Sequence, residues 1–337
     1  MNGDGHILIS AYGVTVRFES GSAALLKDLK DDFAFFSAPE GTAPDIRISA
    51  RLAAPAPSLL KGAKKIFKTS KWTVFKTAAG TRAVFYPEGL LCEYDYRLET
   101  GRLTSADPDL LRELSYLLIL SRLGEKLDLK GLHRVHALAA EFAGAGLLMT
   151  APIGGGKTTL LMQLARDPAF TLLADDTPLV DSRGDIHPFP LRVGLAGSSP
   201  FLKDLPPDSL RPFKRRHYPP KYLVPPPLGG GNGPRETRCG RLFLLKRSGG
   251  APSIQKAGLT EAAFELLRSL VIGIGVPQMA EYFLRPELSD LPGKARILRG
   301  RTQAALALLR NCEFFNFYLA AGPELNARAL RSFLTDL

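Results

Sequence analysis

The chain has 337 residues, of which 45% are hydrophobic and 23% charged, so it can bury a sizeable core and a smaller companion domain. This composition excludes disordered and fibrous proteins. No apolar run approaches the roughly 18 residues of a bilayer span, and no charged-then-apolar leader starts the chain, so we expect a cytoplasmic protein without a membrane partner. Three widely spaced cysteines form neither a disulfide framework nor a paired metal site. The net charge of +11 favours anionic partners such as nucleotides, acidic proteins or nucleic acid.

The first hundred residues predict a β-rich module. Strands are expected over 7–18, 45–52 and 71–77, and a hairpin over 82–98 with its turn at 87–89. A long helix is predicted from Asp107, a candidate N-cap before a proline, to Leu129. We therefore divide the chain into an N-terminal module (1–105), a linking helix (106–130) and a third segment (131–337).

The third segment alternates strand and helix patterns, which predicts an α/β fold. Strands are expected over 135–142, 146–152, 170–174, 241–247 and 311–320, and helices over 158–167, 260–275, 302–311 and 323–337. Between Leu205 and Glu236, frequent proline and glycine leave no hydrophobic periodicity of a helix or strand. This pattern predicts a long irregular excursion.

Residues 151–159 have the sequence APIGGGKTT, a relaxed form of the Walker A pattern in which Ala151 replaces the usual glycine. Successive glycines let a backbone turn tightly around phosphates, a lysine supplies a mobile ammonium, and a hydroxyl at the start of a helix can reach Mg²⁺. The sequence therefore predicts a phosphate cradle. Its candidate residues are Gly154, Gly155, Gly156, Lys157, Thr158 and Thr159.

Two carboxylates, Asp175 and Asp176, end the apolar strand that follows the predicted loop and helix. Because strands that run in the same direction end at one edge of a sheet, this pair is expected beside the phosphates. One carboxylate there can hold Mg²⁺ while the other accepts a hydroxyl proton. A plain turn is the alternative interpretation of two such residues.

The segment 132–195 resembles the core of the HPr kinase/phosphorylase family. It has, in the same order, His136, a strand, a glycine-containing turn, a second strand, the phosphate loop, a helix and a strand that ends in Asp-Asp. The chain has Thr159 where that family usually carries glutamate, and residues 191–202 lack the family's second signature. It therefore resembles a divergent member of the broader set of HPr-kinase-like proteins, which also carry a variable N-terminal module.

The resemblance implies that 131–337 is a P-loop catalytic domain of the HPr kinase and phosphoenolpyruvate carboxykinase type. The implied activity is ATP-dependent phosphorylation of a serine on an acceptor protein or peptide. Lys157 would hold the ATP phosphates, and Thr158 with Asp176 would position Mg²⁺. Asp175 would accept the hydroxyl proton and His136 would orient that carboxylate or the γ-phosphate, although the two aspartates can exchange roles.

Two other functions stay open on the sequence: a nucleotide-binding regulatory module without catalysis, and a small-molecule kinase of the same fold. Oligomerisation of identical chains is also open. The basic segment 211–222 is interpreted as a mobile loop that contacts nucleotide or substrate, because little acid lies near it in the sequence. A solvated surface is the next alternative, and nucleic acid is the least favoured partner.

Overall fold

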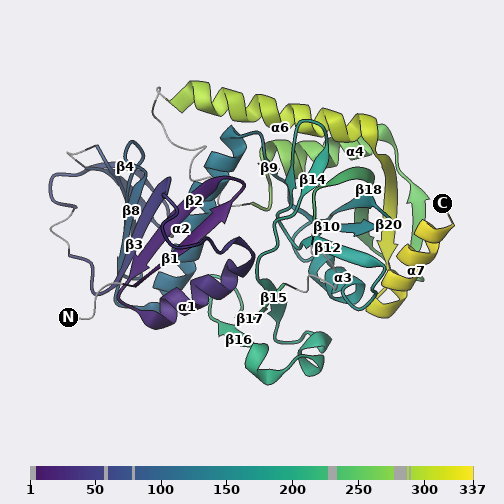
Figure 1. Ribbon diagram of the computed structural model, residues 1–337, viewed down its shortest axis with the longest axis horizontal. Coiled ribbons are helices and arrows are strands. Elements are labelled where there is room, and N and C mark those ends of the chain that lie inside the picture. Colours follow the sequence, from purple (N-terminus) through teal and green to yellow (C-terminus); the bar gives the residue numbers. More distant parts are fainter. Residues whose placement is uncertain are drawn as a thin grey trace. The chain divides into compact units, whose positions relative to one another are not determined.

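The computed structural model describes residues 5–56, 60–77, 80–226, 234–276, 287 and 290–336. The chain has a mixed α/β fold that divides into two compact units, each with its own large sheet (Figure 1). The first unit comprises Met1–Leu123 and Arg211–Leu223, and the second comprises Gly124–Leu210 and Val224–Leu337. In the described ranges, no helix combines the length and the apolar character that crossing a membrane would require.

The first unit contains an eight-stranded sheet in the order β1-β2-β3-β8-β7-β6-β5-β4. Its strands are β1 (Gly5–Ala11), β2 (Val14–Ser20), β3 (Ile46–Leu52), β4 (Lys64–Lys68), β5 (Thr73–Lys76), β6 (Arg82–Tyr86), β7 (Leu90–Asp95) and β8 (Thr100–Ser105). Strand β3 runs parallel to both of its neighbours, and the other pairs are antiparallel. Helix α1 (Ala23–Asp32), followed by η1 (Ala34–Phe36), packs against β1 and β2.

Local sequence signals explain most of this unit. Helix α2 (Pro108–Leu129) begins as predicted, because the Asp107 carboxylate accepts hydrogen bonds from the backbone N–H groups of its first turn. The hairpin predicted over 82–98 is confirmed as β6 and β7. The single strand predicted over 7–18 is wrong: Tyr12 and Gly13 have φ of 50° and 72° and turn the chain back into β2.

The second unit contains a nine-stranded sheet, with the main order β12-β10-β11-β18-β14-β13-β9 and β20 beside β18 and β19. Its strands are β9 (His133–Arg134), β10 (Ala137–Phe142), β11 (Ala145–Thr150), β12 (Phe170–Ala174), β13 (Leu179–Val180), β14 (Asp185–His187), β18 (Thr237–Arg247), β19 (Ser253–Lys256) and β20 (Glu313–Leu319). Strand β10 is antiparallel to both β11 and β12, so β11 and β12 run in the same direction with β10 between them. Strands β18 and β20 continue that direction.

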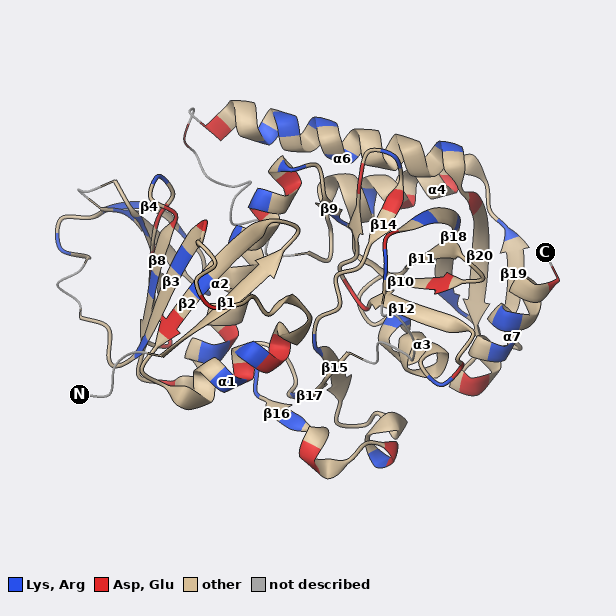
Figure 2. Cartoon of the chain, viewed as in Figure 1, with Lys and Arg blue, Asp and Glu red and all other residues tan. Residues whose placement is uncertain are grey.

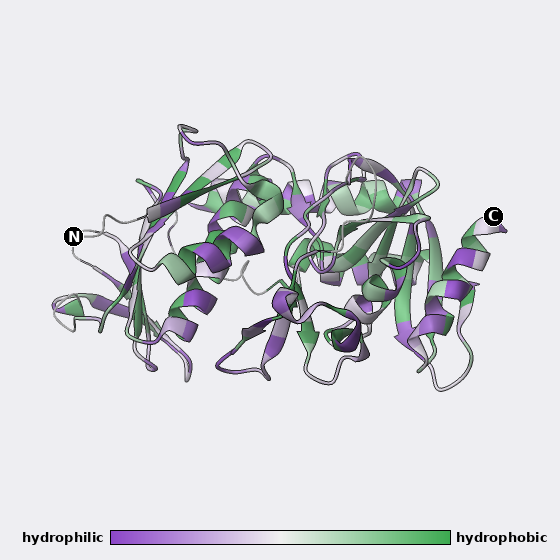
Figure 3. Ribbon diagram, turned by 60° about the horizontal axis from the view of Figure 1, so that its bottom comes forward, coloured by the Kyte–Doolittle hydropathy of each residue, from purple (hydrophilic) through white to green (hydrophobic). Residues whose placement is uncertain are grey.

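Helices cover both faces of this sheet, and the alternation along β10 separates the two cores. Leu138 and Ala140 join one apolar cluster with α3 (Lys157–Leu164) and α7 (Pro323–Thr335). Ala137 and Ala139 join the other with α4 (Leu259–Leu266) and α6 (Leu291–Asn311). Hydrophobic residues are accordingly concentrated along the strands in Figure 3. This double burial explains why the strands are apolar runs rather than alternating ones.

Two of the helices differ in extent from the prediction. The helix expected over 260–275 is α4 followed by the π-helical η5 (Leu267–Ile272). The helix expected over 302–311 is the end of the longer α6, whose charged residues after the N-cap Asp290 are all basic (Figure 2).

The excursion between 205 and 236 contains more regular structure than its composition predicts. Segment β15 (Val193–Ala196) and η3 (Pro200–Asp204) precede it, and it includes η4 (Pro207–Ser209), β16 (Arg211–Phe213) and β17 (Lys221–Val224). Strands β16 and β17 form an antiparallel hairpin in the first unit. Residues 227–233 lie outside the described residues.

The expectation that little acid lies near these basic residues is wrong. The Arg211 guanidinium lies 2.8 Å from the buried Asp32 carboxylate. Arg216 lies 3.3 Å from Asp107. These carboxylates come from segments far away in the sequence, so local charge counting did not find them. Their ion pairs tie the hairpin to its own unit.

Candidate functional site

The glycine-rich loop (151–156) joins β11 to α3 and has backbone geometry that only glycine adopts easily. Gly154 and Gly156 have φ of 77° and 101°. A Cβ on Gly155 would lie 2.6 Å from the Cβ of Ala151. Since no side-chain cap covers the start of α3, the loop presents backbone N–H groups at a helix N-terminus, the geometry that favours bound anions.

Lys157, the first residue of α3, extends its side chain inward and is only 5% exposed. Its Nζ donates a hydrogen bond to the Ala151 carbonyl oxygen (2.9 Å) and lies 3.0 Å from Nε2 of His136. Asp176 Oδ1 is 4.0 Å away. Burial lowers the pKa of the Lys157 ammonium, and the Asp176 carboxylate opposes part of that change. An anion placed here would relieve the cost of burying this charge.

His136 sits just before β10, where its backbone N–H donates to the Ser269 carbonyl oxygen (3.1 Å). Burial lowers the pKa of its imidazole, and the Lys157 charge lowers it further. The ring is therefore neutral at pH 7, and Nε2 faces a donor, which places the single proton on Nδ1. Among the described residues Nδ1 makes no hydrogen bond, and Asp176 Oδ1 lies 3.9 Å from it.

The two aspartates after β12 face different partners. Asp175 Oδ2 accepts a hydrogen bond from the Thr158 hydroxyl (3.1 Å). The Asp176 side chain is 58% exposed and faces Lys157 and His136. From the sequence, Thr158 and Asp176 were expected to position Mg²⁺, with the two aspartates able to exchange roles; in the structure the Thr158 hydroxyl contacts Asp175. Oxygen ligands of this kind suit a hard cation such as Mg²⁺.

The structure brings most of the predicted site residues together. Gly154, Gly155 and Gly156 form the loop, and Lys157, His136 and Asp176 form one cluster beside it. Thr159 is exposed on α3. The antiparallel β10 separates the strand before the loop from the strand before the aspartates, but both strands end at the same edge.

Gly275, which was not among the residues predicted for the site, lies against the His136 ring. Its φ is 101°, and a Cβ there would lie 2.3 Å from Cδ2 of the imidazole. The preceding segment η5 supplies the carbonyl of Ser269 that holds the His136 backbone. The alternating glycines of the sequence VIGIG were the available signal, but they do not indicate which side chain packs on them.

A network of buried charged residues contacts the backbone of η5. Arg301 donates to the Leu270 carbonyl oxygen (2.6 Å) and pairs with Asp128 (2.8 Å). His133 Nδ1 lies 2.8 Å from the same Asp128 carboxylate. Burial would raise the pKa of Asp128, but Arg301 and His133 outweigh it and lower that pKa.

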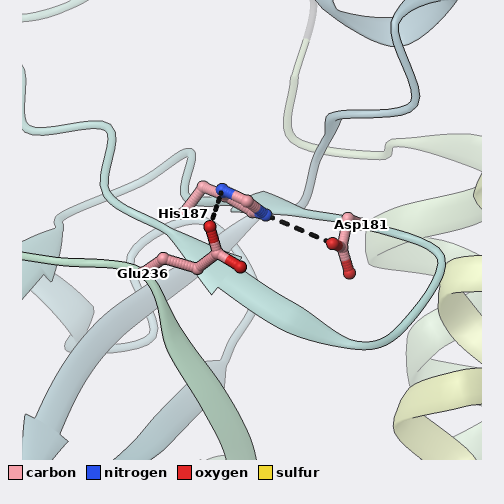
Figure 4. A group of neighbouring side chains, drawn as sticks. All are labelled: Asp181, His187 and Glu236. Carbon is pink, nitrogen blue, oxygen red and sulfur yellow. Dashed lines mark hydrogen bonds and ion pairs between the residues drawn. The ribbon is translucent and has the colours of Figure 1, made fainter. Parts of the chain in front are cut away.

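A second polar cluster contains Asp181, His187 and Glu236, whose nearest ligand atoms all lie within 4.8 Å of one another (Figure 4). The imidazole lies between the carboxylates, with Nε2 3.4 Å from Asp181 and Nδ1 3.3 Å from Glu236. Such residues can hold a divalent ion. However, the Arg183 guanidinium already pairs with both carboxylates, at 3.2 and 2.9 Å, so a cation would compete with it. Glu236 lies far from Asp181 and His187 in the sequence, and the three residues were not predicted as a cluster.

Comparison with known proteins gives no independent indication of function, since the chain matches no family model and no curated protein significantly. The geometry of the site therefore carries the functional argument.

Proposed function

We propose that the protein is an ATP-dependent kinase that transfers phosphate to a serine hydroxyl on a protein or peptide, with chemistry similar to that of HPr kinase. One observation carries the proposal: the buried Lys157, at the end of a glycine-rich loop, lies within 4.0 Å of both His136 and Asp176. A cation, a neutral imidazole and an exposed carboxylate are thus gathered where a phosphate would sit. Phosphoryl transfer requires positioning and charge stabilisation of this kind.

The loop and the start of α3 would hold the nucleotide. The backbone N–H groups around Gly155 and the ammonium of Lys157 would contact phosphate oxygens. Thr158 and Asp175 would hold Mg²⁺, because their oxygen atoms already lie 3.1 Å apart. When bound, Mg²⁺ supplies positive charge that neutralises the phosphates during transfer. The metal role assigned to Asp176 from the sequence passes to Asp175.

Asp176 is the better proton acceptor. Its carboxylate is exposed, so an acceptor side chain can reach it, and Nδ1–H of His136 at 3.9 Å can orient it. The seryl oxygen forms a bond to the γ-phosphorus as the bond between that phosphorus and the β–γ bridging oxygen breaks. The seryl proton moves to Asp176, and ADP leaves.

A kinase explains Asp176 better than a nucleotide-binding module without catalysis does. Binding of phosphate and metal uses the loop, Lys157, Thr158 and Asp175. It gives no role to a second, exposed carboxylate beside a buried neutral imidazole. That arrangement is typical of a proton-transfer site.

The test is Mg-dependent ATP binding by calorimetry, followed by phosphotransfer from γ-labelled ATP to an array of serine-containing peptides. Matched peptides with alanine in place of serine are the controls for the acceptor. We expect binding by the wild type and label on serine peptides only. Absence of ATP binding would refute the nucleotide site, and ATP binding without transfer to any peptide or free small hydroxyl compound would favour the non-catalytic module.

A further inference from the structure

A pocket of about 520 Å³ opens beside the glycine-rich loop, on the side away from the aspartates. Residues 150–155 form one wall, residues 244–247 at the end of β18 form the floor, and α4 with the start of η5 forms the other wall. Strand β11, which precedes the loop, has β18 as its neighbour on one side and β10 on the other. Strand β12, which precedes Asp175, lies beyond β10. Neither aspartate lines the pocket, nor do Thr158 and His136.

Two large apolar side chains border this pocket and are unusually exposed. Ile153 of the loop is 84% exposed and Phe264 of α4 is 67% exposed. The ring of an exposed aromatic residue next to a hollow is a surface on which a flat heterocycle can stack, an interaction worth about 1–3 kcal/mol per base. A volume of this size lies in the range of roughly 300–1,000 Å³ that is typical of small-ligand sites.

The charged side chains that line the pocket would not disfavour a nucleotide whose phosphates bind at the adjacent loop. The Glu261 carboxylate is engaged by Lys246 (2.5 Å) and by the side-chain amide of Asn316 (2.9 Å). Glu265 is paired with Arg268 (3.2 Å). The acidic side chains that line the pocket are therefore neutralised and would not repel a nucleotide.

One contact ties the pocket floor to the loop. Arg247 Nη2 donates a hydrogen bond to the Gly154 carbonyl oxygen (2.6 Å). Residues 151–155 of the loop also line the pocket. A ligand whose phosphates bind at the loop can therefore extend from the loop into the pocket.

We propose that this pocket receives the base and ribose of the nucleotide, with Phe264 and Ile153 contacting the base. This inference rests on the proposed phosphate site, and it orients the nucleotide across the loop. The triphosphate end points toward Lys157 and Asp176, and the nucleoside end toward α4. The acceptor hydroxyl then approaches from the opposite side, where the exposed carboxylate lies.

Calorimetry with two probes, Mg-ATP and inorganic tripolyphosphate with Mg²⁺, tests the orientation. Because only ATP carries a base, Phe264→Ala should weaken ATP binding about tenfold to a hundredfold and leave tripolyphosphate binding unchanged. Ile153→Ala should act in the same direction. The matched control is Leu259→Ala, another exposed apolar residue of α4 that does not line the pocket, and we expect no change in either affinity.

The outcomes separate this inference from the proposed function. If the wild type binds neither probe, the phosphate site itself is wrong. If both probes bind and Phe264→Ala leaves the ATP affinity at the wild-type value, or weakens both probes equally, the pocket assignment is overturned while the phosphate site stands. An unchanged ATP affinity with a raised KM for a peptide acceptor would assign the pocket to the acceptor instead and would equally overturn the inference.

Discussion

The Nζ of Lys157 lies 3.0 Å from Nε2 of His136, and both side chains are buried. A lysine ammonium can lie this close to an imidazole nitrogen only if that nitrogen is unprotonated and accepts a hydrogen bond from the ammonium. The ring must therefore be neutral. Both groups have lowered pKa values, chiefly because of burial. The site therefore carries an internal electrostatic cost that a bound phosphate would relieve.

Replacing the lysine tests this relation directly. Lys157→Met keeps an unbranched side chain of similar length and removes the buried charge, so we expect the apo protein to be as stable as the wild type or more so. ATP affinity should fall about a hundredfold, because charge-assisted contacts to phosphate are lost. Thermal unfolding without ligand and calorimetry with ATP measure the two effects. A large loss of apo stability with unchanged ATP affinity would contradict the assignment.

The neutral His136 predicts a pH effect on stability. Its pKa is lowered in the folded state, so below about pH 6.5 the unfolded chain binds a proton that the folded chain does not. Folding stability should therefore fall as the pH drops through that value, by up to about 1.4 kcal/mol per pH unit from this residue. Denaturant unfolding at about pH 7.5 and pH 5.5 should show a shallower loss for His136→Gln. An identical loss in both proteins would show that folding does not lower the pKa of His136.

Mutations of the two aspartates should have different effects on phosphotransfer and on its Mg²⁺ dependence. We expect Asp176→Asn to reduce phosphotransfer at least a hundredfold with Mg-ATP binding retained, since only the proton acceptor is lost. Asp175→Asn should raise the Mg²⁺ concentration needed for half-maximal activity about tenfold, because it removes the partner of Thr158. Rates measured over a Mg²⁺ titration distinguish the two. The reverse pattern would restore the roles expected from the sequence.

The sequence could predict the local geometry of the glycine-rich loop but not the partners that the fold brings to its neighbours. Glycines, a lysine and a hydroxyl in consecutive positions specify a local geometry, so the loop before α3 could be placed from residues alone. The roles of Asp175 and Asp176 could not be placed in this way, because adjacent residues differ only in the partners that the fold brings to them. The position of Gly275 against His136 depends on a contact between distant segments, and the local glycine pattern does not indicate which side chain packs there.

The same distinction holds for the elements of the fold. Asp107 and Pro108 predicted the start of α2 because capping is a local interaction. The hairpin of β16 and β17 was missed, since its basic residues pair with carboxylates more than one hundred positions earlier, such as Asp107 with Arg216 and Asp32 with Arg211. The turn at Tyr12 was missed because a non-glycine residue with positive φ is uncommon.

The ion pair of the hairpin predicts a stability effect in the first unit. Arg211→Met would leave the Asp32 carboxylate, which has 0% side-chain exposure, without this partner. Breaking a buried pair in this way costs about 3 kcal/mol. The matched control is Lys214→Met on the same hairpin, whose 80% exposed side chain pairs with Asp109 at 3.4 Å and should contribute under about 0.5 kcal/mol. Equal denaturation midpoints for the two variants would show that the hairpin is not anchored by Arg211.

The contact of Gly275 with His136 predicts that the backbone of this segment positions the imidazole. Gly275→Ala introduces both an unfavourable φ and a methyl group 2.3 Å from Cδ2 of the ring. The matched control is Gly131→Ala, which has a similar φ of 85° but no atom within 4 Å of the added Cβ. Both variants should lose about 1–2 kcal/mol of stability from backbone strain, and Gly275→Ala should lose more because the ring must move.

Only Gly275→Ala should also disturb the site. A displaced ring loses its contact with Lys157 and its burial, so the pKa of His136 should rise toward its ordinary value. Titration of the imidazole by NMR measures this shift without depending on catalysis, and phosphotransfer should fall at least tenfold in the same variant. If Gly131→Ala and Gly275→Ala have the same His136 titration and the same transfer rate, Gly275 only accommodates the turn and does not position the imidazole.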